Sequence, residues 1–464
     1  MEQLRNFAAR IEQRMTASGI MIFGFASAIL IGGIILMLPI CNADGKWLNF
    51  IDALFTSCTS VCVTGLVTIV PATQFTLIGK IVLLLLIQFG GLGIIACTMG
   101  AFLILRRQIT IRDRVVIQES YNLNTLSGIV KLLIYVLKGT FFVEAAGAFF
   151  YAFWFIPEFG FFRGIWYAVF HSISAFCNAG IDILGETSLQ VYQTNPLINF
   201  TTMMLIILSG LGFTVWSDLC LTAKRIVRRE APVRRAFETM KLHTKLVVVM
   251  TLALVIGGAV GFFILEYANP QTMAGMSFGE KWMASLFQSV TTRTAGFFTI
   301  PQNLLREESR LLTCVLMFIG GSPGGTAGGV KTTTVAILLL TCWSVLKGNE
   351  DTICFRRRIA FSTIRTGFSI FTVAFLAVIA GTIIIVTLEQ VPLIDALYEV
   401  VSAVGTVGLT TGLTPQLRSI SKLVIILLMY MGRIGPVTLA LAFAGKVGKK
   451  QNKIKLPEER IMVG

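Results

Sequence analysis

Four short polar stretches that end in glycine recur along this otherwise apolar chain. They end at Gly65, Gly180, Gly296 and Gly408, which are 115, 116 and 112 residues apart. Glycine adopts a positive φ at little cost, so it lets successive backbone carbonyls point toward one axis. A ring of such carbonyls can replace the hydration shell of a cation. The stretches therefore predict an ion pathway lined by Cys62, Val63, Thr64, Gly65, Cys177, Asn178, Ala179, Gly180, Arg293, Thr294, Ala295, Gly296, Gly405, Thr406, Val407 and Gly408.

The alternative for each stretch is a tight turn that caps a helix. One such turn would favour that reading, but four at nearly equal spacing, each after a short amphipathic segment, favour a shared pathway. The side chains differ among the four loops, as expected if backbone carbonyls bind the ion.

A glycine-rich run interrupts a later apolar segment. Six glycines and a proline cannot maintain a straight helix, so we expect a flexible loop within the membrane, below the four stretches. The run resembles a phosphate-binding loop, but Val330 separates Gly329 from Lys331 and the spacing fails. The alternative is a passive kink. The loop comprises Gly320, Gly321, Ser322, Pro323, Gly324, Gly325, Thr326, Ala327, Gly328, Gly329 and Lys331.

Two arginines stand out because their surroundings are apolar. Arg433 is the single charge between residues 423 and 445. A cation inside a membrane is costly, so we expect Arg433 to face an aqueous cavity; a structural salt bridge is the alternative. Arg293 would block a pore if it faced the axis. Its side chain is expected to point behind the loop, with Glu144 or Glu399 as possible partners.

Composition indicates an integral membrane protein. Of 464 residues, 55% are hydrophobic and 14% are charged, and several charge-free runs approach the roughly 20 residues that span a bilayer. The net charge is +15, and 26 of 39 Lys and Arg fall in 1–16, 106–114, 224–245, 347–365 and 446–460. The positive-inside rule places these segments and both termini in the cytoplasm. Anionic lipid explains this charge better than nucleic acid does.

The chain reads as one unit repeated four times: an apolar helix, a short amphipathic helix, a glycine-containing loop and a second apolar helix. The first helices are expected at 19–38, 138–156, 246–268 and 366–390, each ending at a proline (Pro39, Pro157, Pro270 and Pro392). The short helices are expected at 50–60, 165–174, 282–291 and 393–402, and the second helices at 78–105, 197–222, 310–346 and 421–445.

These units predict an all-α integral membrane fold with eight transmembrane helices and four re-entrant pore loops. Each unit is a helix–pore loop–helix repeat, and the four have pseudo-four-fold symmetry around one pore. The predicted division is a cytoplasmic tail at 1–16, repeats at 17–105, 106–224, 225–347 and 348–446, and a second cytoplasmic tail at 447–464.

The four loops resemble those of the Trk/Ktr/HKT potassium transporters over essentially the whole chain, and the absence of extra helices before the first repeat resembles the Ktr branch. The resemblance implies a potassium uptake subunit in the plasma membrane, and Gly65 implies selectivity for potassium. It also implies a gating role for residues 320–331, a pore-lining Arg433, a homodimer and a cytoplasmic nucleotide-binding ring. No enzymatic activity or organic cofactor is expected, and K⁺ at the loops is the only expected metal.

Three other functions stay open at this point. One is a sodium-coupled or less selective K⁺/Na⁺ transporter. Another is an alternating-access transporter of a different solute, although such proteins usually carry inverted or paired repeats and intramembrane acids. The third is a membrane enzyme that uses the glycine-rich run for nucleotide, which lacks the required spacing near Lys331.

Overall fold

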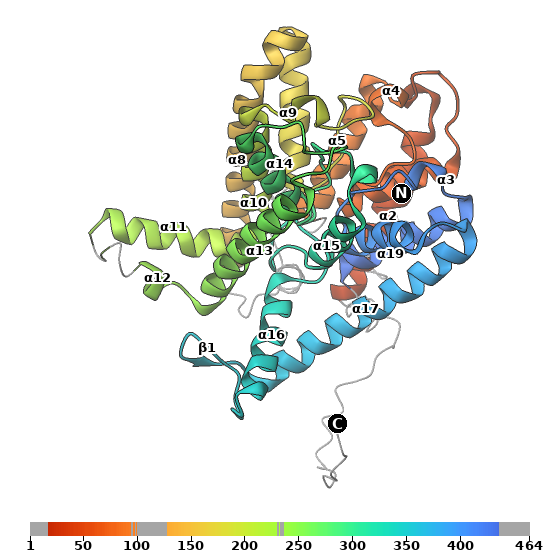
Figure 1. Cartoon of the computed structure of the whole chain (residues 1–464). Coiled ribbons are helices and arrows are strands. Elements are labelled where there is room, and N and C mark those ends of the chain that lie inside the picture. The colour runs from red at the N-terminus through yellow and green to blue at the C-terminus, as the bar shows by residue number, and fades with distance from the viewer. Residues whose placement is uncertain are drawn as a thin grey trace, which may run out of the picture.

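The computed structural model describes residues 17–93, 96–97, 99, 128–229, 232 and 236–435. The predicted tails, 1–16 and 447–464, lie outside the described residues. So do the predicted repeat boundaries near 105 and 446 and the far ends of two predicted second helices. The described chain is built mainly from helices (Figure 1).

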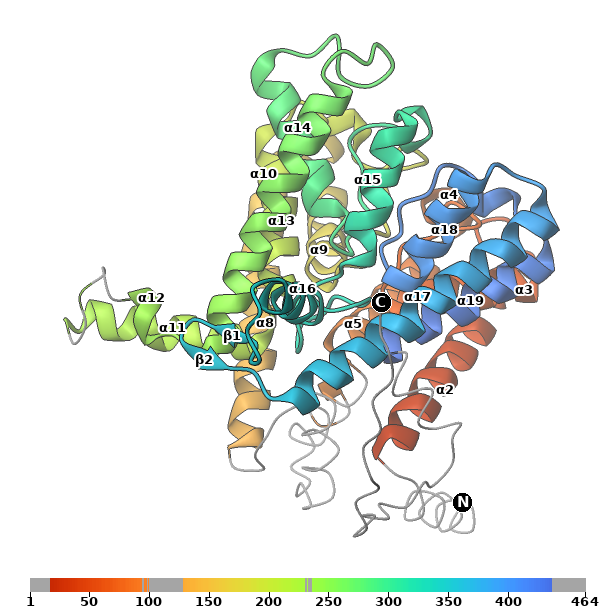
Figure 2. The ribbon, with the colours of Figure 1, turned by 60° about the horizontal axis from the view of Figure 1, so that its bottom comes forward.

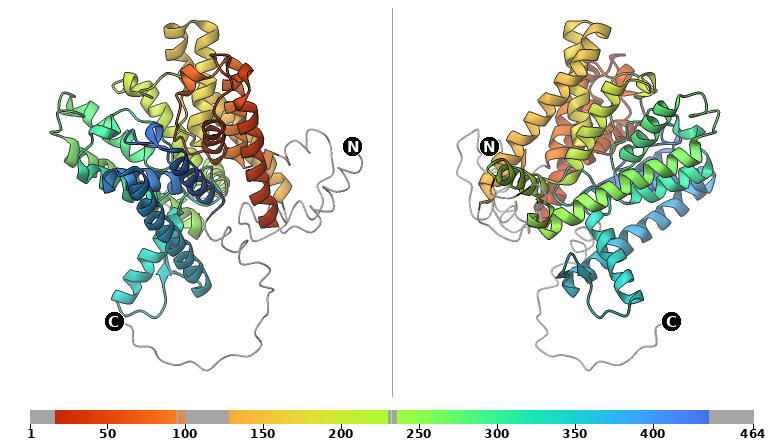
Figure 3. Two further views of the ribbon diagram at one scale, coloured as in Figure 1. Left: turned by 90° about the vertical axis from the view of Figure 1, so that its right-hand side faces the viewer. Right: turned by 60° about the vertical axis from the view of Figure 1, so that its left-hand side comes forward.

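Four long apolar helices are the main candidates for membrane spans within the described part of the chain: α2 (Ala17–Met37), α8 (Ile129–Phe159), α13 (Leu242–Glu266) and α17 (Phe361–Glu389). Only 28–33% of each apolar window is buried by the rest of the protein. Most of each helix surface is therefore available to lipid. Figure 3 shows α8 extending with α9 (Phe161–Cys177) as a hairpin beyond the other helices at one end.

The predicted proline endings are correct in part. Helix α2 stops just before Pro39, α13 just before Pro270 and α17 just before Pro392. The prediction is wrong for Pro157, because α8 continues to Phe159 and ends at Gly160, whose φ is +80°. The helix continues there without the hydrogen bond that a non-proline residue at 157 would donate to the carbonyl of Phe153. Helix α8 also begins before the predicted 138, since Lys131 and Lys138 do not interrupt it.

Each long helix is followed by a shorter amphipathic helix that packs against it: α3 (Phe50–Cys62), α9, α14 (Phe278–Thr291) and α18 (Leu393–Gly405). Serines on three of these helices donate hydrogen bonds to a carbonyl of the long helix. Ser57 bonds to Ile29 at 2.7 Å, Ser172 to Glu144 at 2.6 Å and Ser289 to Val255 at 2.8 Å. The helices approach closely because Gly32, Gly147 and Gly258 lie opposite these serines, where a Cβ would clash.

Within the described residues, the second helices break at or beside glycines. They are α5 (Leu77–Leu92), α10 (Pro196–Leu211), α15 (Glu307–Phe318) and α19 (Ser419–Ile434). Gly93, Gly212 and Gly435 follow three of them with nearly the same backbone, φ 86–99° and ψ 131–143°. The predicted straight helix at 197–222 is therefore wrong. The chain bends by 99° at Gly212 into α11 (Phe213–Val227).

In the third unit the chain leaves α15 through residues 319–331 and resumes as α16 (Thr332–Leu346), which confirms the predicted interruption. The remaining elements are short: α4 (Pro71–Gln74), α12 (Ala236–Thr239), the 3₁₀ helices η1 (Pro39–Cys41), η2 (Gln190–Tyr192), η4 (Gln302–Leu304) and η5 (Thr414–Gln416), and an antiparallel hairpin of β1 (Ile353–Cys354) and β2 (Arg357–Arg358). Figure 2 shows α11, α12 and the hairpin together on one side of the molecule.

Acidic residues occupy the first turns of α3 and α18, as expected for the positive end of a helix dipole. Asp52 of α3 pairs with Lys422 of α19 at 2.7 Å, and Asp395 of α18 pairs with Arg310 of α15 at 3.1 Å. Each pair joins a short helix to the second helix of a different predicted unit. These contacts connect the first unit to the fourth and the fourth to the third.

Candidate functional site

The four glycine-ending stretches share one backbone conformation. Three of the short helices end at the first member of the stretch, Cys62, Cys177 or Gly405, while Arg293 lies in a turn just after α14. The next residue has a positive φ of 52–65° in every loop: Val63, Asn178, Thr294 and Thr406. Two residues later comes the glycine, with φ between 61° and 98°. Two left-handed residues separated by a single residue bring the chain sharply out of the helix.

A hydroxyl near the end of each short helix holds the loop in this shape. Gly65 N donates to Thr59 Oγ1 at 2.9 Å, and Gly408 N donates to Ser402 Oγ at 3.0 Å. In the second loop Ser174 Oγ donates to Ile181 O at 2.6 Å, and in the third Thr291 donates to Phe297 O. In each loop the backbone carbonyl of the residue that carries this hydroxyl also accepts a hydrogen bond. The donor is the backbone N–H of the residue just before the glycine, at 2.8–3.0 Å.

The four glycines lie against one another in cyclic order. A Cβ added to any of them would lie 2.6 Å or less from the carbonyl oxygen that precedes the glycine of the next loop. The contacts run from Gly65 to Ala179, from Gly180 to Ala295, from Gly296 to Val407 and from Gly408 back to Thr64. Segments more than 100 residues apart in sequence therefore meet around a common centre, and no side chain fits between them.

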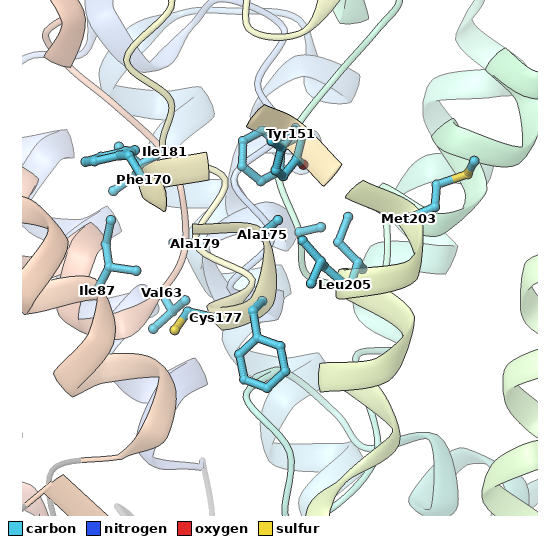
Figure 4. Packing of buried hydrophobic residues seen from close by; sticks show 14 of the residues in the cluster. Val63, Ile87, Tyr151, Phe170, Ala175, Cys177, Ala179, Ile181, Met203 and Leu205 are labelled. Atoms are coloured by element: carbon cyan, nitrogen blue, oxygen red, sulfur yellow. The ribbon is translucent and has the colours of Figure 1, made fainter. Parts of the chain in front are cut away.

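Small residues of the second helices pack directly behind the loops. A Cβ on Gly91 would clash with Cys177, and one on Gly90 or Gly432 would clash with the carbonyl of Val61 or Val404. Figure 4 shows Val63 and Cys177, from two different loops, side by side within the buried core. The close packing leaves these backbones little room to move.

The glycine-rich segment 319–331 is clasped by the bend between α10 and α11. Ser322 N donates to Gly210 O at 2.9 Å, and Phe213 N donates to Gly324 O at 2.9 Å. Hydrogen bonds also hold the two ends of the segment together. Gly320 N donates to Val330 O at 2.9 Å, and the hydroxyls of Ser322 and of Thr332, the first residue of α16, lie 2.8 Å apart.

The same segment also lies against the ends of the short helices. Thr326 Oγ1 donates to the carbonyl of Phe176 at 3.3 Å. A Cβ on Gly329 would lie 3.1 Å from the carbonyl oxygen of Gly405, and one on Gly328 would clash with the side chain of Thr406. The segment therefore lies directly beside two of the four loops.

Arg433 links this segment to the first unit. Its guanidinium donates to the carbonyls of Thr326, Gly90 and Gly91, the last at 3.2 Å. Among the described residues it has no acidic partner, so the alternative of a structural salt bridge finds no support in this part of the chain. Carbonyls suffice because five N–H groups on a rigid plane can bond to several backbone oxygens at once.

A cavity of about 190 Å³ lies next to these contacts. Arg433 and Lys331 both line it, with Gly91, Gly324 and Phe25 among the other lining residues. Lys331 Nζ donates to Ala327 O at 2.6 Å and to Gly328 O at 3.3 Å. Two basic side chains thus border one cavity beside the glycine-rich segment.

The expected partners of Arg293 are wrong. Glu144 accepts from Gln88 Nε2 at 3.1 Å, and Glu399 accepts from Thr410 and from Thr414, the latter at 2.6 Å. Arg293 is nearly buried, and its Nε has no hydrogen-bond partner in the described chain. Both carboxyls are therefore occupied, Glu144 by an amide of α5 and Glu399 by two hydroxyls that follow the fourth loop.

Two sets of residues escaped the sequence reasoning: the serines that join short and long helices, and the hydroxyls that brace the loops. The bracing hydroxyl lies six residues before the glycine in three loops and five before it in the third. This nearly constant offset is a signal from which the bracing hydroxyls could have been predicted.

Comparison with known proteins shows the class. Residues 8–453 match the family model described as "TrkH: Cation transport protein", so the chain belongs to the TrkH family of cation transport proteins. Together with the apolar helices, this makes it a multi-pass membrane protein.

Particular relatives are similar over their full length. The potassium/sodium uptake protein NtpJ of Enterococcus hirae is 39% identical, over 98% of this chain and 99% of the relative. The Ktr system potassium uptake protein B of Bacillus subtilis is 36% identical, over 97% of both chains. A crystal structure of the potassium transporter TrkH from Vibrio parahaemolyticus matches with a TM-score of 0.74 at 18% identity, over 93% of this chain and 86% of that one, and shares the fold.

Proposed function

We propose that this chain is a potassium uptake subunit through which K⁺ crosses the membrane at the centre of the four loops. The observation that carries the proposal is the closed circle of glycine-to-carbonyl contacts between loops. Backbone oxygens from the stretches ending at Gly65, Gly180, Gly296 and Gly408 replace the water around a dehydrated cation. Names of the full-length relatives support potassium as that cation.

The proposed architecture is four helix–pore loop–helix repeats around this centre, with eight crossings and both termini in the cytoplasm. The shared breaks at Gly93, Gly212 and Gly435 support the repeats. The basic segments support the orientation. We keep the boundaries 17–105, 106–224, 225–347 and 348–446 for the repeats.

The gate in this proposal is the segment Gly320–Lys331 with Arg433. Contact with the ends of two short helices supports a position directly beneath the ion site. In this proposal the loop obstructs the path, and the basic side chains of Arg433 and Lys331 beside it oppose a potassium ion. Opening requires the loop to leave the carbonyls and amides that now hold it.

The membrane potential supplies the driving force. It is worth about 2.3 kcal/mol per charge per 100 mV. At roughly 1.4 kcal/mol per decade of concentration, that sustains about a forty-fold gradient without ATP. No organic cofactor is required in this chain.

The proposed partners are supported by the names of the relatives. Proteins named as part of a "Ktr system" support a separate regulatory subunit. We propose a cytoplasmic nucleotide-binding ring as that subunit and a homodimer as the assembly, with one pathway in each protomer.

Uptake by purified protein tests the function. The chain is reconstituted into vesicles under an inside-negative potential, and tracer entry is followed with K⁺, Rb⁺ and Na⁺ as competitors. The proposal requires saturable entry that K⁺ and Rb⁺ inhibit more strongly than Na⁺. Entry of no alkali cation, even after deletion of residues 324–328, would refute it.

One alternative has an observation in its favour. The relative with 39% identity is named a potassium/sodium uptake protein. Sodium-coupled or less selective transport would appear in the same assay as K⁺ entry that depends on Na⁺, or as equal competition by the two ions.

A further inference from the structure

The C-terminal end of α11 carries an unpaired basic cluster. Lys224, Arg225, Arg228 and Arg229 are all exposed, and none forms an ion pair or side-chain hydrogen bond with a described residue. Exposed apolar side chains lie on the same helix, with Leu221 49% and Val227 82% exposed. A helix that presents cations and apolar side chains together is typical of a membrane interface.

Contacts of α11 place it at the depth of that interface. Tyr135 of α8 donates to Cys220 at 3.2 Å, and Asp218 accepts from the backbone N of Lys241, just before α13, at 2.9 Å. Lys241 directly precedes α13, an apolar candidate span that starts at Leu242 and ends 24 residues further on at Glu266. At 1.5 Å per residue this is about 36 Å, slightly more than the roughly 30 Å hydrocarbon core.

The direction of α11 also fits an interface. It leaves α10 at 99° and extends sideways from the bundle (Figure 1). If α10 crosses the membrane, α11 lies close to the membrane plane. The proposed orientation puts this end of the bundle at the cytoplasmic leaflet.

We propose that the basic cluster of α11, Lys224, Arg225, Arg228 and Arg229, binds anionic phospholipid of the cytoplasmic leaflet. Guanidinium and ammonium groups form strong charge-assisted hydrogen bonds to phosphate oxygens. The exposed Leu221 and Val227 contact the acyl region of the same lipids. Charge complementarity selects an anionic headgroup over a zwitterionic one.

Lipid bound here also restrains the glycine-rich segment. The first residue of α11, Phe213, donates to Gly324 O, and Gly210 just before the bend accepts from Ser322. Holding α11 in the membrane plane therefore stabilises the conformation in which the bend clasps the segment. The consequence for ion flux, less leak without a partner subunit, rests on the proposed function.

Native mass spectrometry of the full chain tests the binding. Protein is released from micelles that contain equal amounts of phosphatidylglycerol and phosphatidylcholine, and the retained lipids are counted. Each basic residue near an anionic surface is worth about 1 kcal/mol, or about a five-fold preference. The variant with Lys224→Gln, Arg225→Gln, Arg228→Gln and Arg229→Gln should lose at least ten-fold of the preference for phosphatidylglycerol.

The matched control removes the same charge elsewhere on this side: Lys347→Gln, Arg356→Gln, Arg357→Gln and Arg358→Gln. It should lose much less of the preference than the α11 variant, since Arg358 is already paired with Asp351. Equal retention of phosphatidylglycerol by wild type and the α11 variant would overturn the lipid assignment and leave the cluster to a protein partner.

Rubidium flux into vesicles tests the coupling. The α11 variant should leak several-fold more than wild type in phosphatidylglycerol vesicles and equally in phosphatidylcholine vesicles. If lipid retention falls but flux is unchanged, the coupling is overturned and the lipid site stands. If no variant conducts, the proposed function fails, while retention still decides the lipid site.

Discussion

The substitution Gly408→Ala separates the ring of contacts from simple backbone strain, because the chain offers a matched control four residues later. Gly408 and Gly412 have the same φ of +95°. A Cβ at Gly408 would clash with the carbonyl of Thr64 and lie 2.8 Å from Gly65 Cα, whereas a Cβ at Gly412 has no heavy atom within 4 Å. Both alanines therefore share the left-handed penalty of roughly 1–2 kcal/mol.

Only Gly408→Ala must also move a neighbouring loop. Carbon atoms pack at about 3.5–4.0 Å, so the fourth and first loops must separate by about 1 Å. Carbonyls displaced that far no longer match a dehydrated K⁺. We expect Gly408→Ala to lose at least ten-fold in discrimination between K⁺ and Na⁺, or about 1.4 kcal/mol. Gly412→Ala should change it less than two-fold.

The measurement is tracer Rb⁺ uptake into vesicles, with K⁺ or Na⁺ as competitor, for wild type and both variants at matched protein content. Size-exclusion profiles and thermal unfolding show whether each variant is folded. Equal loss of discrimination in the two alanine variants would mean that backbone strain explains the effect. Unchanged discrimination in folded Gly408→Ala would refute the ring as the ion site.

Other substitutions test the remaining parts of the proposal. Gly65→Ser places a side chain against Ala179 O and should weaken discrimination against Na⁺; the same K⁺/Na⁺ preference before and after the change would argue against the first loop. Deleting Gly324–Gly328 removes the clasp to Phe213 and should raise Rb⁺ flux without a partner, and unaltered flux would exclude a gating role. Arg433→Ala removes charge-assisted hydrogen bonds worth about 1.5–3 kcal/mol each and should raise basal flux at least ten-fold with normal expression, while Arg433→Lys, which keeps the charge but not the planar fork, should be intermediate. Loss of assembly in Arg433→Ala would instead assign the residue a structural role.

Hydrophobic pattern was enough to find most helices of this protein. The short helices were expected at 50–60 and 393–402 and occur at Phe50–Cys62 and Leu393–Gly405. Their amphipathic period and the glycine that follows are local properties, so the sequence carries them. The interruption at 319–331 was predictable for the same reason, because six glycines and a proline have no stable straight-helix alternative.

The breaks at single glycines were not predictable from local pattern. Gly212 lies between Leu211 and Phe213 in an apolar run, where a helical glycine is equally consistent with the sequence. Gly212 has a positive φ, and a Cβ at this position would lie 2.5 Å from the carbonyl oxygen of Pro323, which is more than 100 residues away in sequence. Pro157 differs from the prediction in the opposite sense, because α8 continues two residues past it.

The site was predictable as a set of loops but not as an arrangement. Spacing indicated that four stretches are equivalent, yet it could not give the order in which they contact one another. Arg433 bonds to carbonyls 107 and 343 residues away in sequence. An acidic partner for Arg293 was wrongly predicted because the positions of charges in a sequence do not show which carboxyls already accept other hydrogen bonds.

Arg433 lies two residues before the glycine at which its helix ends, and the corresponding positions before Gly93 and Gly212 are Gly91 and Gly210. A symmetric assembly of four identical subunits would repeat any such arginine four times. In the proposed four-repeat architecture a single polypeptide encodes all four repeats, which removes that constraint. One guanidinium, and one glycine-rich insertion beside it, can then act on the pathway without three unwanted duplicates that would repel every cation.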